Sequence, residues 1–111
     1  MDKFKFIKDK NFSELPKTSG VYCFSDGNEV IYIGKAINIQ NRVKNHFSGK
    51  YWWEKALRRF GSSGRIGFIK TNSEIEALIL EANLIKKYLP PFNVRLTDDK
   101  DYLYIVMPIK Q

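Results

Sequence analysis

Residues 20–34 read GVYCFSDGNEVIYIG and predict the first two strands of a sheet. Two runs of β-branched and aromatic residues flank Asp26-Gly27-Asn28, a sequence typical of a hairpin turn. Setting Tyr22 directly opposite Tyr32 requires an odd loop, and a three-residue hairpin with a bulge would supply it. We therefore expect an antiparallel pair with both tyrosine hydroxyls on one face. The two runs are Gly20–Phe24 and Val30–Ile33.

The pattern outward from this hairpin alternates helices and strands. Asn38 is a good helix cap, and the face made by Ile39, Val43 and Phe47 recurs every four residues. Ser73 with Glu76 has the form of a capping box. We expect a loop over residues 1–19, helices over 38–47, 51–60 and 73–88, and strands over 65–71 and 102–107; Gly49, the glycines and serines at 61–64 and Pro90-Pro91 would end the helices.

Length and composition predict one soluble domain over residues 1–111, with its core at about 15–105. Hydrophobic residues make up 43% and charged residues 28% of the 111, as in ordinary globular proteins. No apolar run approaches the roughly 20 residues that span a bilayer, and the first residues do not resemble a secretion signal. The sequence thus favours a cytoplasmic protein with no membrane partner.

Single copies of two residue types limit the metal chemistry. Cys23 is the only cysteine and His46 the only histidine, so one chain cannot build a disulfide or a Cys/His zinc site. We expect Cys23 to be a small buried strand residue. Any metal must be held by oxygen ligands.

The net charge of +7 is what a protein with an acidic partner would carry. Such a field attracts polyanions, and nucleic acid is the first candidate. A basic surface kept for solubility explains the charge equally well, so charge alone leaves both interpretations open.

Glu81 is the residue that the helix pattern singles out. With about 100° of rotation per residue, Glu76, Asn83 and Lys87 share one face that meets water. Glu81 falls in the opposite, apolar arc, where a carboxylate must be neutralised, paired with a cation or bound to a metal. An ion pair across the core and a metal site both remain possible. The apolar arc comprises Ala77, Leu78, Ala82, Leu84, Ile85 and Tyr88.

Other polar residues could complete a site for phosphodiester cleavage. That reaction needs a group to activate water, cations for the charge on phosphorus, and help for the leaving oxygen. Arg42 and His46, four residues apart, share a helix face. Each residue also has an ordinary structural explanation as a strand, surface or helix-face side chain. The candidates are Tyr22, Tyr32, Lys35, Arg42 and His46.

The tripeptides Gly20-Val21-Tyr22 and Tyr32-Ile33-Gly34, ten residues apart, resemble the two motifs that name the GIY-YIG nucleases. The likeness extends over roughly 15–105 and is greatest to the amino-terminal domains of the UvrC branch. The matching segments are Tyr32-Ile33-Gly34-Lys35-Ala36, Asn38, Arg42-Val43, Glu76-Ala77-Leu78, Leu80-Glu81-Ala82-Asn83-Leu84-Ile85-Lys86, Pro90, Phe92-Asn93-Val94-Arg95-Leu96 and Asp98-Asp99-Lys100.

The resemblance implies an α/β (α+β) fold, a three-stranded antiparallel sheet flanked by helices, and one Mg²⁺ or Mn²⁺ bound by Glu81. Our element order agrees, and one carboxylate with several waters suits a hard ion. It further implies that Tyr32 activates water with help from Lys35 and Tyr22, that Arg42 stabilises the phosphorane, and that Asn93 supports the site. Some UvrC relatives carry tyrosine where this chain has His46, so a share of His46 in water activation is less firmly implied.

The resemblance implies single-strand incision of DNA, as in the cut that the UvrC branch makes 3′ to a lesion. Excision-repair proteins would be partners if the domain is part of a longer chain. The alternatives are a non-catalytic nucleic-acid-binding module and a free-standing nuclease outside excision repair. A small-molecule enzyme lacks support, because the sequence has no nucleotide-binding glycine loop.

Overall fold

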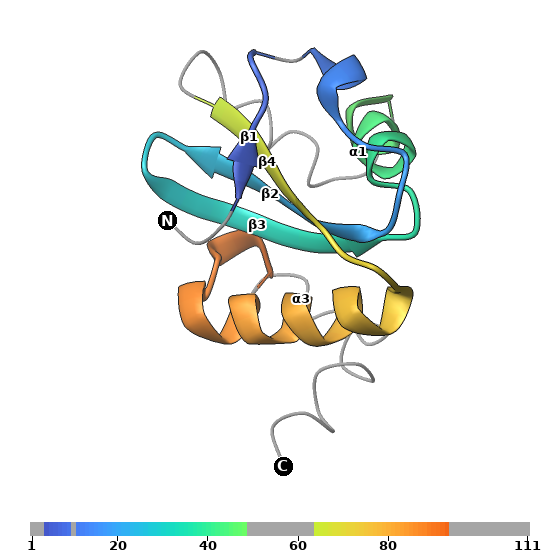
Figure 1. The fold of residues 1–111 in the computed structure, drawn as a ribbon. Helices are drawn as coiled ribbons and strands as arrows, with labels where there is room; N and C mark the ends of the chain where they lie inside the picture. Colours follow the sequence, from blue (N-terminus) through green and yellow to red (C-terminus); the bar gives the residue numbers. More distant parts are fainter. Residues whose placement is uncertain (1–3, 10, 49–63, 94–111) are drawn as a thin grey trace.

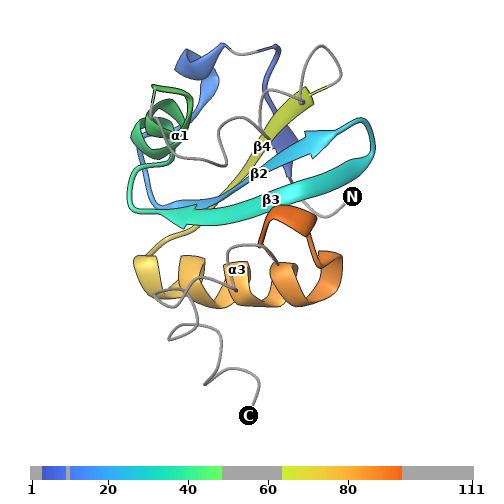
Figure 2. The same cartoon turned by 180° about the vertical axis from the view of Figure 1, so that it is seen from behind.

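The computed structural model describes residues 4–9, 11–48 and 64–93, which form a sheet between two helices. Figures 1 and 2 show α1 on one side of the sheet and α3 along the other. The predicted helix at 51–60, the strand at 102–107 and Gly49 lie outside these residues. So does the predicted turn at 61–64, except for Gly64, which is the first residue of a strand. The elements are β1 Lys5–Phe6, a 3-10 turn Phe12–Glu14, β2 Gly20–Asp26, β3 Glu29–Ala36, α1 Ile39–Ser48, β4 Gly64–Lys70 and α3 Glu74–Tyr88.

The sheet has four antiparallel strands in the order β1-β4-β2-β3. The predicted fold class is confirmed, with one strand more than expected. The extra strand, β1, comes from the segment predicted as loop, where Phe6 pairs with Gly67 of β4. A strand of two residues carries no alternation of its own, so only this long-range pairing defines it.

The hairpin register differs from the prediction. Asp26 pairs with Glu29, which leaves a two-residue turn whose Gly27 has a φ of 64°. Tyr22 therefore pairs with Gly34, and Tyr32 pairs with Phe24. Direct pairing of the two tyrosines was wrong, but they lie diagonally on one face, with ring centroids 6.1 Å apart.

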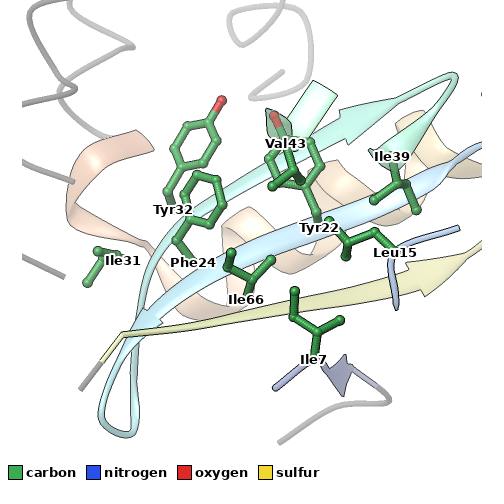
Figure 3. Close-up of a cluster of buried hydrophobic side chains, with 9 residues drawn as sticks. All are labelled: Ile7, Leu15, Tyr22, Phe24, Ile31, Tyr32, Ile39, Val43 and Ile66. Atoms are coloured by element: carbon green, nitrogen blue, oxygen red, sulfur yellow. The ribbon is translucent and has the colours of Figure 1, made fainter. Parts of the chain in front are cut away.

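A β-bulge explains how the two tyrosines still share a face. The register shifts between Phe24 and Ser25, so that Ile31 is the extra residue of β3. Ile31 and Tyr32 consequently belong to the same hydrophobic cluster although they are neighbours in the chain. Figure 3 shows Tyr22, Phe24 and Tyr32 on the side of the sheet that carries Val43 of α1.

The second cluster lies between the sheet and α3. It contains Val21, Cys23 and Ile33 from the strands, and Ala77 and Leu84 from the helix. Cys23 is completely buried, as predicted, and burial raises the pKa of its thiol to about 12. It is therefore an unreactive core residue.

The ends of α3 follow the sequence signals. Ser73 Oγ accepts the N–H of Glu76 at 3.1 Å, so the predicted N-cap is confirmed. At the other end Leu89 adopts a left-handed conformation, and its N–H donates to the carbonyl of Ile85, just before Pro90. Leu78 was predicted in the buried arc but is 40% exposed, because the helix buries only a narrow stripe.

No helix in the described part of the chain is long and apolar enough to cross a membrane.

Candidate active site

Tyr22 lies at the centre of the site and is completely buried in the middle of β2. Its phenol group crosses the backbone of Gly34, the residue paired with it on β3. A Cβ at Gly34 would lie only 2.6 Å from Cζ of Tyr22. A side chain at position 34 would therefore clash with the Tyr22 ring where it lies against β3, and glycine avoids this clash.

Three side chains surround the Tyr22 hydroxyl. His46 Nε2 lies 2.5 Å from the hydroxyl oxygen. Arg42 and Tyr32 also form hydrogen bonds with it. Burial raises the pKa of Tyr22 to about 12, although Arg42 and Tyr32 lower it. Tyr22 consequently keeps its proton at neutral pH and is a hydrogen-bond donor.

The helix α1 places Arg42 and His46 over the tyrosines, one turn apart as predicted. The helix begins against the entry loop: Gln40 donates through Nε2 to the carbonyl of Leu15, and Asn38 Oδ1 accepts the N–H of Asn41. This anchors the first turn, so the next turn is held in a fixed position above β2. The Asn38 cap is confirmed.

His46 is buried and neutral. Burial and the neighbouring Arg42 lower the pKa of its imidazole to about 3. The interaction with the Tyr22 oxygen instead raises the pKa of Arg42 above its usual value, so the guanidinium stays protonated. The site thus contains a permanent cation beside an uncharged ring.

Glu81 is 9% exposed, which confirms its predicted burial on the inner side of α3. Its carboxylate accepts the backbone N–H of Lys35, at the end of β3. Burial raises the pKa of Glu81, and the charges of Lys35 and Arg42 oppose the rise. Glu81 in turn raises the pKa of Tyr22, so its carboxylate is close to the hydroxyl network.

Asn93 completes the edge of the site. Its Oδ1 accepts the N–H of Ile33 at 2.7 Å, and its Nδ2 donates to the carbonyl of Ile33 at 2.8 Å. Since β3 is an edge strand, the side-chain amide takes the place of a neighbouring strand for one residue. Both polar groups of Asn93 are occupied by the backbone, so it holds Ile33 between Tyr32 and Gly34.

The donor set suits a hard divalent cation held by few protein ligands. Within the described residues, no group of three His, Cys, Asp or Glu side chains could hold a metal. Glu81 is the only buried carboxylate among them. A site with one carboxylate and several water ligands fits Mg²⁺, which keeps much of its hydration shell.

The structure brings Arg42, His46 and Tyr32 together around the Tyr22 hydroxyl, and it places Glu81 next to Lys35. Asn93 instead binds the backbone of Ile33 on the edge strand β3. Sequence reasoning missed the direct contact of Tyr22 with His46 and the bond between Glu81 and the Lys35 N–H. The spacing of Arg42 and His46 on α1 was the available signal for the first. A side-chain bond to a backbone N–H leaves no trace in the sequence.

Comparison with known proteins identifies the family. The model of the UvrC-like GIY-YIG domain matches residues 18–94. The chain belongs to the UvrC-like GIY-YIG family. UvrABC system protein C of Borrelia duttonii is 50% identical over 94 residues, which are 84% of this chain and 15% of that protein. The protein of the same name from Fusobacterium nucleatum is 46% identical over 92 residues, 83% of this chain and 16% of its own length.

Solved structures of the same domain agree in fold. The GIY-YIG N-terminal endonuclease domain of UvrC from Thermotoga maritima, bound to magnesium as its catalytic divalent cation, is 36% identical. The match covers 78% of this chain and 98% of that domain, with a TM-score of 0.65. A point mutant of that domain, also bound to its catalytic cation, gives 34% identity and a TM-score of 0.67, covering 78% and 97%. This chain therefore has the fold of the GIY-YIG domain of UvrC.

Proposed function

We propose that this domain hydrolyses a phosphodiester bond in one strand of DNA, using a single Mg²⁺ or Mn²⁺ bound at Glu81. The observation that carries the proposal is the buried Glu81 carboxylate beside Arg42 and the tyrosine pair. A buried carboxylate with a raised pKa, next to the cations Lys35 and Arg42, is typical of a site that binds charge rather than of a packed core.

The roles of the side chains follow from their chemistry. Tyr32 would accept a proton from the attacking water or orient it, and Tyr22 holds the Tyr32 hydroxyl through their hydrogen bond. Lys35 would lower the cost of negative charge on Tyr32. Arg42, which stays protonated, would stabilise the charge that builds on phosphorus.

Glu81 would hold the metal, and Asn93 would support the site through the backbone of Ile33. When bound, the cation supplies Lewis-acid stabilisation of the phosphate and the leaving oxygen. Because the Glu81 carboxylate already accepts the Lys35 N–H, its orientation is set before any ion binds.

The related domains support this assignment of positions. Three of the solved Thermotoga maritima structures carry tyrosine-to-phenylalanine substitutions, at positions ten and fourteen residues apart. Tyr22, Tyr32 and His46 have the same spacing. His46 then stands where that domain has a tyrosine, in agreement with the departure noted in the sequence.

The biological setting is part of the proposal. The chain spans 15–16% of the length of the related UvrABC system proteins. We infer a role in nucleotide excision repair, with DNA as the substrate and, if the domain is part of a longer chain, other excision-repair proteins as partners. Lesion recognition would then depend on these partners or on other domains of a longer chain, because one small domain offers few phosphate contacts.

A nicking assay tests the proposal directly. Supercoiled plasmid and lesion-bearing duplex DNA are incubated with the domain, with and without Mg²⁺ or Mn²⁺. We expect metal-dependent conversion of supercoiled to nicked circles, with no activity in chelator. Metal-independent DNA binding without any nicking, for wild type and Glu81→Gln alike, would favour the non-catalytic binding module instead.

A further inference from the structure

The direction of the hydrogen bonds around Tyr22 can be derived from the chemistry of its neighbours. A phenolic hydroxyl has one proton to donate and two lone pairs to accept with. A guanidinium has only donors, so Arg42 must donate to the Tyr22 oxygen. The Tyr22 proton must therefore point to another neighbour.

His46 is the neighbour that can take this proton. Its Nε2 is 2.5 Å from the Tyr22 oxygen. The imidazole is neutral, since its pKa is about 3, and a neutral imidazole accepts at one nitrogen and donates at the other. The hydrogen bond with Tyr32 lowers the pKa of Tyr22, as a donor to the Tyr22 oxygen does. An Nε2–H would be a third donor to that oxygen, and the Tyr22 proton could then go only to Tyr32, which would reverse that hydrogen bond.

We propose that His46 is a positioning residue: as the Nδ1–H tautomer it accepts the Tyr22 proton and so orients the hydrogen bonds of the whole network. The order is then fixed as Tyr32 O–H to Tyr22, and Tyr22 O–H to His46. The effect of His46 on catalysis rests on the proposed function. The assignment of the His46 tautomer is independent of it.

This order has a consequence for Tyr32. With its single proton committed to Tyr22, the Tyr32 oxygen presents lone pairs to the rest of the site. An oxygen in this state can accept a hydrogen bond from the attacking water and so orient it, whereas a hydroxyl with its proton turned toward the water would be the donor instead. His46 itself is a poor final base, because burial and Arg42 disfavour the imidazolium.

The tautomer can be observed without any assay of activity. His46 is the only histidine of the chain, so long-range ¹H–¹⁵N spectra of the ¹⁵N-labelled, tag-free domain contain a single imidazole. We expect Nδ1 to be protonated and Nε2 unprotonated at pH 7. Tyr22→Phe should abolish this preference. An Nε2–H tautomer in the wild type, or a preference unchanged in Tyr22→Phe, would overturn the proposal.

Kinetics test the consequence for catalysis. His46→Phe keeps an aromatic ring but has no acceptor, so we expect single-turnover cleavage to fall about tenfold, the effect of one lost hydrogen bond, with DNA affinity unchanged. His46→Gln places an amide oxygen near the Nε2 position and should recover most of the rate. Circular dichroism confirms that both variants fold.

A double-mutant cycle separates positioning from an independent role. In the Tyr22→Phe background, His46→Phe should cause no further loss, because the hydroxyl that it orients is absent. Multiplicative losses, or a His46→Gln as slow as His46→Phe, would refute the positioning role. An inactive wild type would instead refute the proposed function and leave the spectroscopic result intact.

Discussion

Replacing Glu81 by Gln removes the only buried carboxylate among the described residues while keeping the shape of the side chain. Burial raises the pKa of Glu81 in the folded protein, so the charged form is disfavoured relative to the unfolded chain. The stability that this carboxyl contributes is fully present below its unfolded pKa and is lost as pH rises through the folded pKa. At pH 7 the buried charge of Glu81 therefore lowers the free energy of unfolding of the metal-free wild type, and Glu81→Gln removes this loss.

The size of the gain follows from the shift. Each unit by which the pKa is raised corresponds to about 1.4 kcal/mol in the free energy of unfolding. Glu81→Gln should be more stable than wild type at pH 7, and the difference should vanish as pH falls through about 4, the usual pKa of glutamate. Urea unfolding at several pH values, in chelator, measures both effects.

Metal should reverse the order of stability. An ion that binds only the folded state stabilises it by about 1.4 kcal/mol at ten times its Kd. Wild type should gain this stability with Mg²⁺ or Mn²⁺, whereas the stability of Glu81→Gln should not change with metal. Glu81→Gln should also cleave no DNA. Glu29→Gln is the matched control, because Glu29 is an exposed carboxylate at the start of β3.

The opposite result would support a buried ion pair. Removing one partner of such a pair strands the charge of the other and costs about 3 to 5 kcal/mol. A Glu81→Gln variant destabilised to that extent, yet with normal Mn²⁺ binding by calorimetry, would end the metal-ligand assignment.

Four further predictions concern other parts of the domain. Tyr32→Phe should fold and bind DNA normally but cleave about 100-fold more slowly, the usual loss of acid-base help; near-normal single-turnover rates would move the base elsewhere. Duplex affinity should fall steeply with salt, by a slope of about 0.9 per phosphate contact in a fluorescence titration, and a flat profile would argue against phosphate contacts. Asn93→Ala should cost about 2 to 4 kcal/mol in denaturant unfolding, because the N–H and C=O of Ile33 both lose their partner, and an unchanged midpoint would show that water replaces the amide. Gly34→Ala should cost about 1 to 3 kcal/mol and reduce cleavage, since its Cβ displaces the Tyr22 ring, and wild-type values of both would contradict that close approach.

The elements of the site were predictable where local chemistry defines them. The burial of Glu81 followed from its place in the helix, and the Ser73 and Asn38 caps followed from side chains that bond their own backbone. The family resemblance supplied the metal and the roles of the side chains. These roles stay predictions until the variants are measured.

The register of the hairpin was not predictable from the same information. Direct pairing of Tyr22 with Tyr32 assumed a bulge within the loop, but the bulge lies at Ile31, inside β3. Ile31 packs in the hydrophobic cluster beneath α1. This is a tertiary contact, so the alternation of residues along the strand does not reveal it. The predicted burial of Leu78 was wrong for a similar reason, since tertiary packing decides how wide a stripe of α3 is buried.

Residues 32–35 of β3 explain why this short segment organises the site. Tyr32 supplies a hydroxyl to the network, and Ile33 is fixed through its backbone by Asn93. Gly34 gives the Tyr22 ring room to reach the network, while the Lys35 N–H orients the Glu81 carboxylate. The proposed metal ligand and the hydroxyl network are thus attached to consecutive residues of one strand. Since neighbouring residues of a paired strand move together, their separation can be held to the tolerance that catalysis requires.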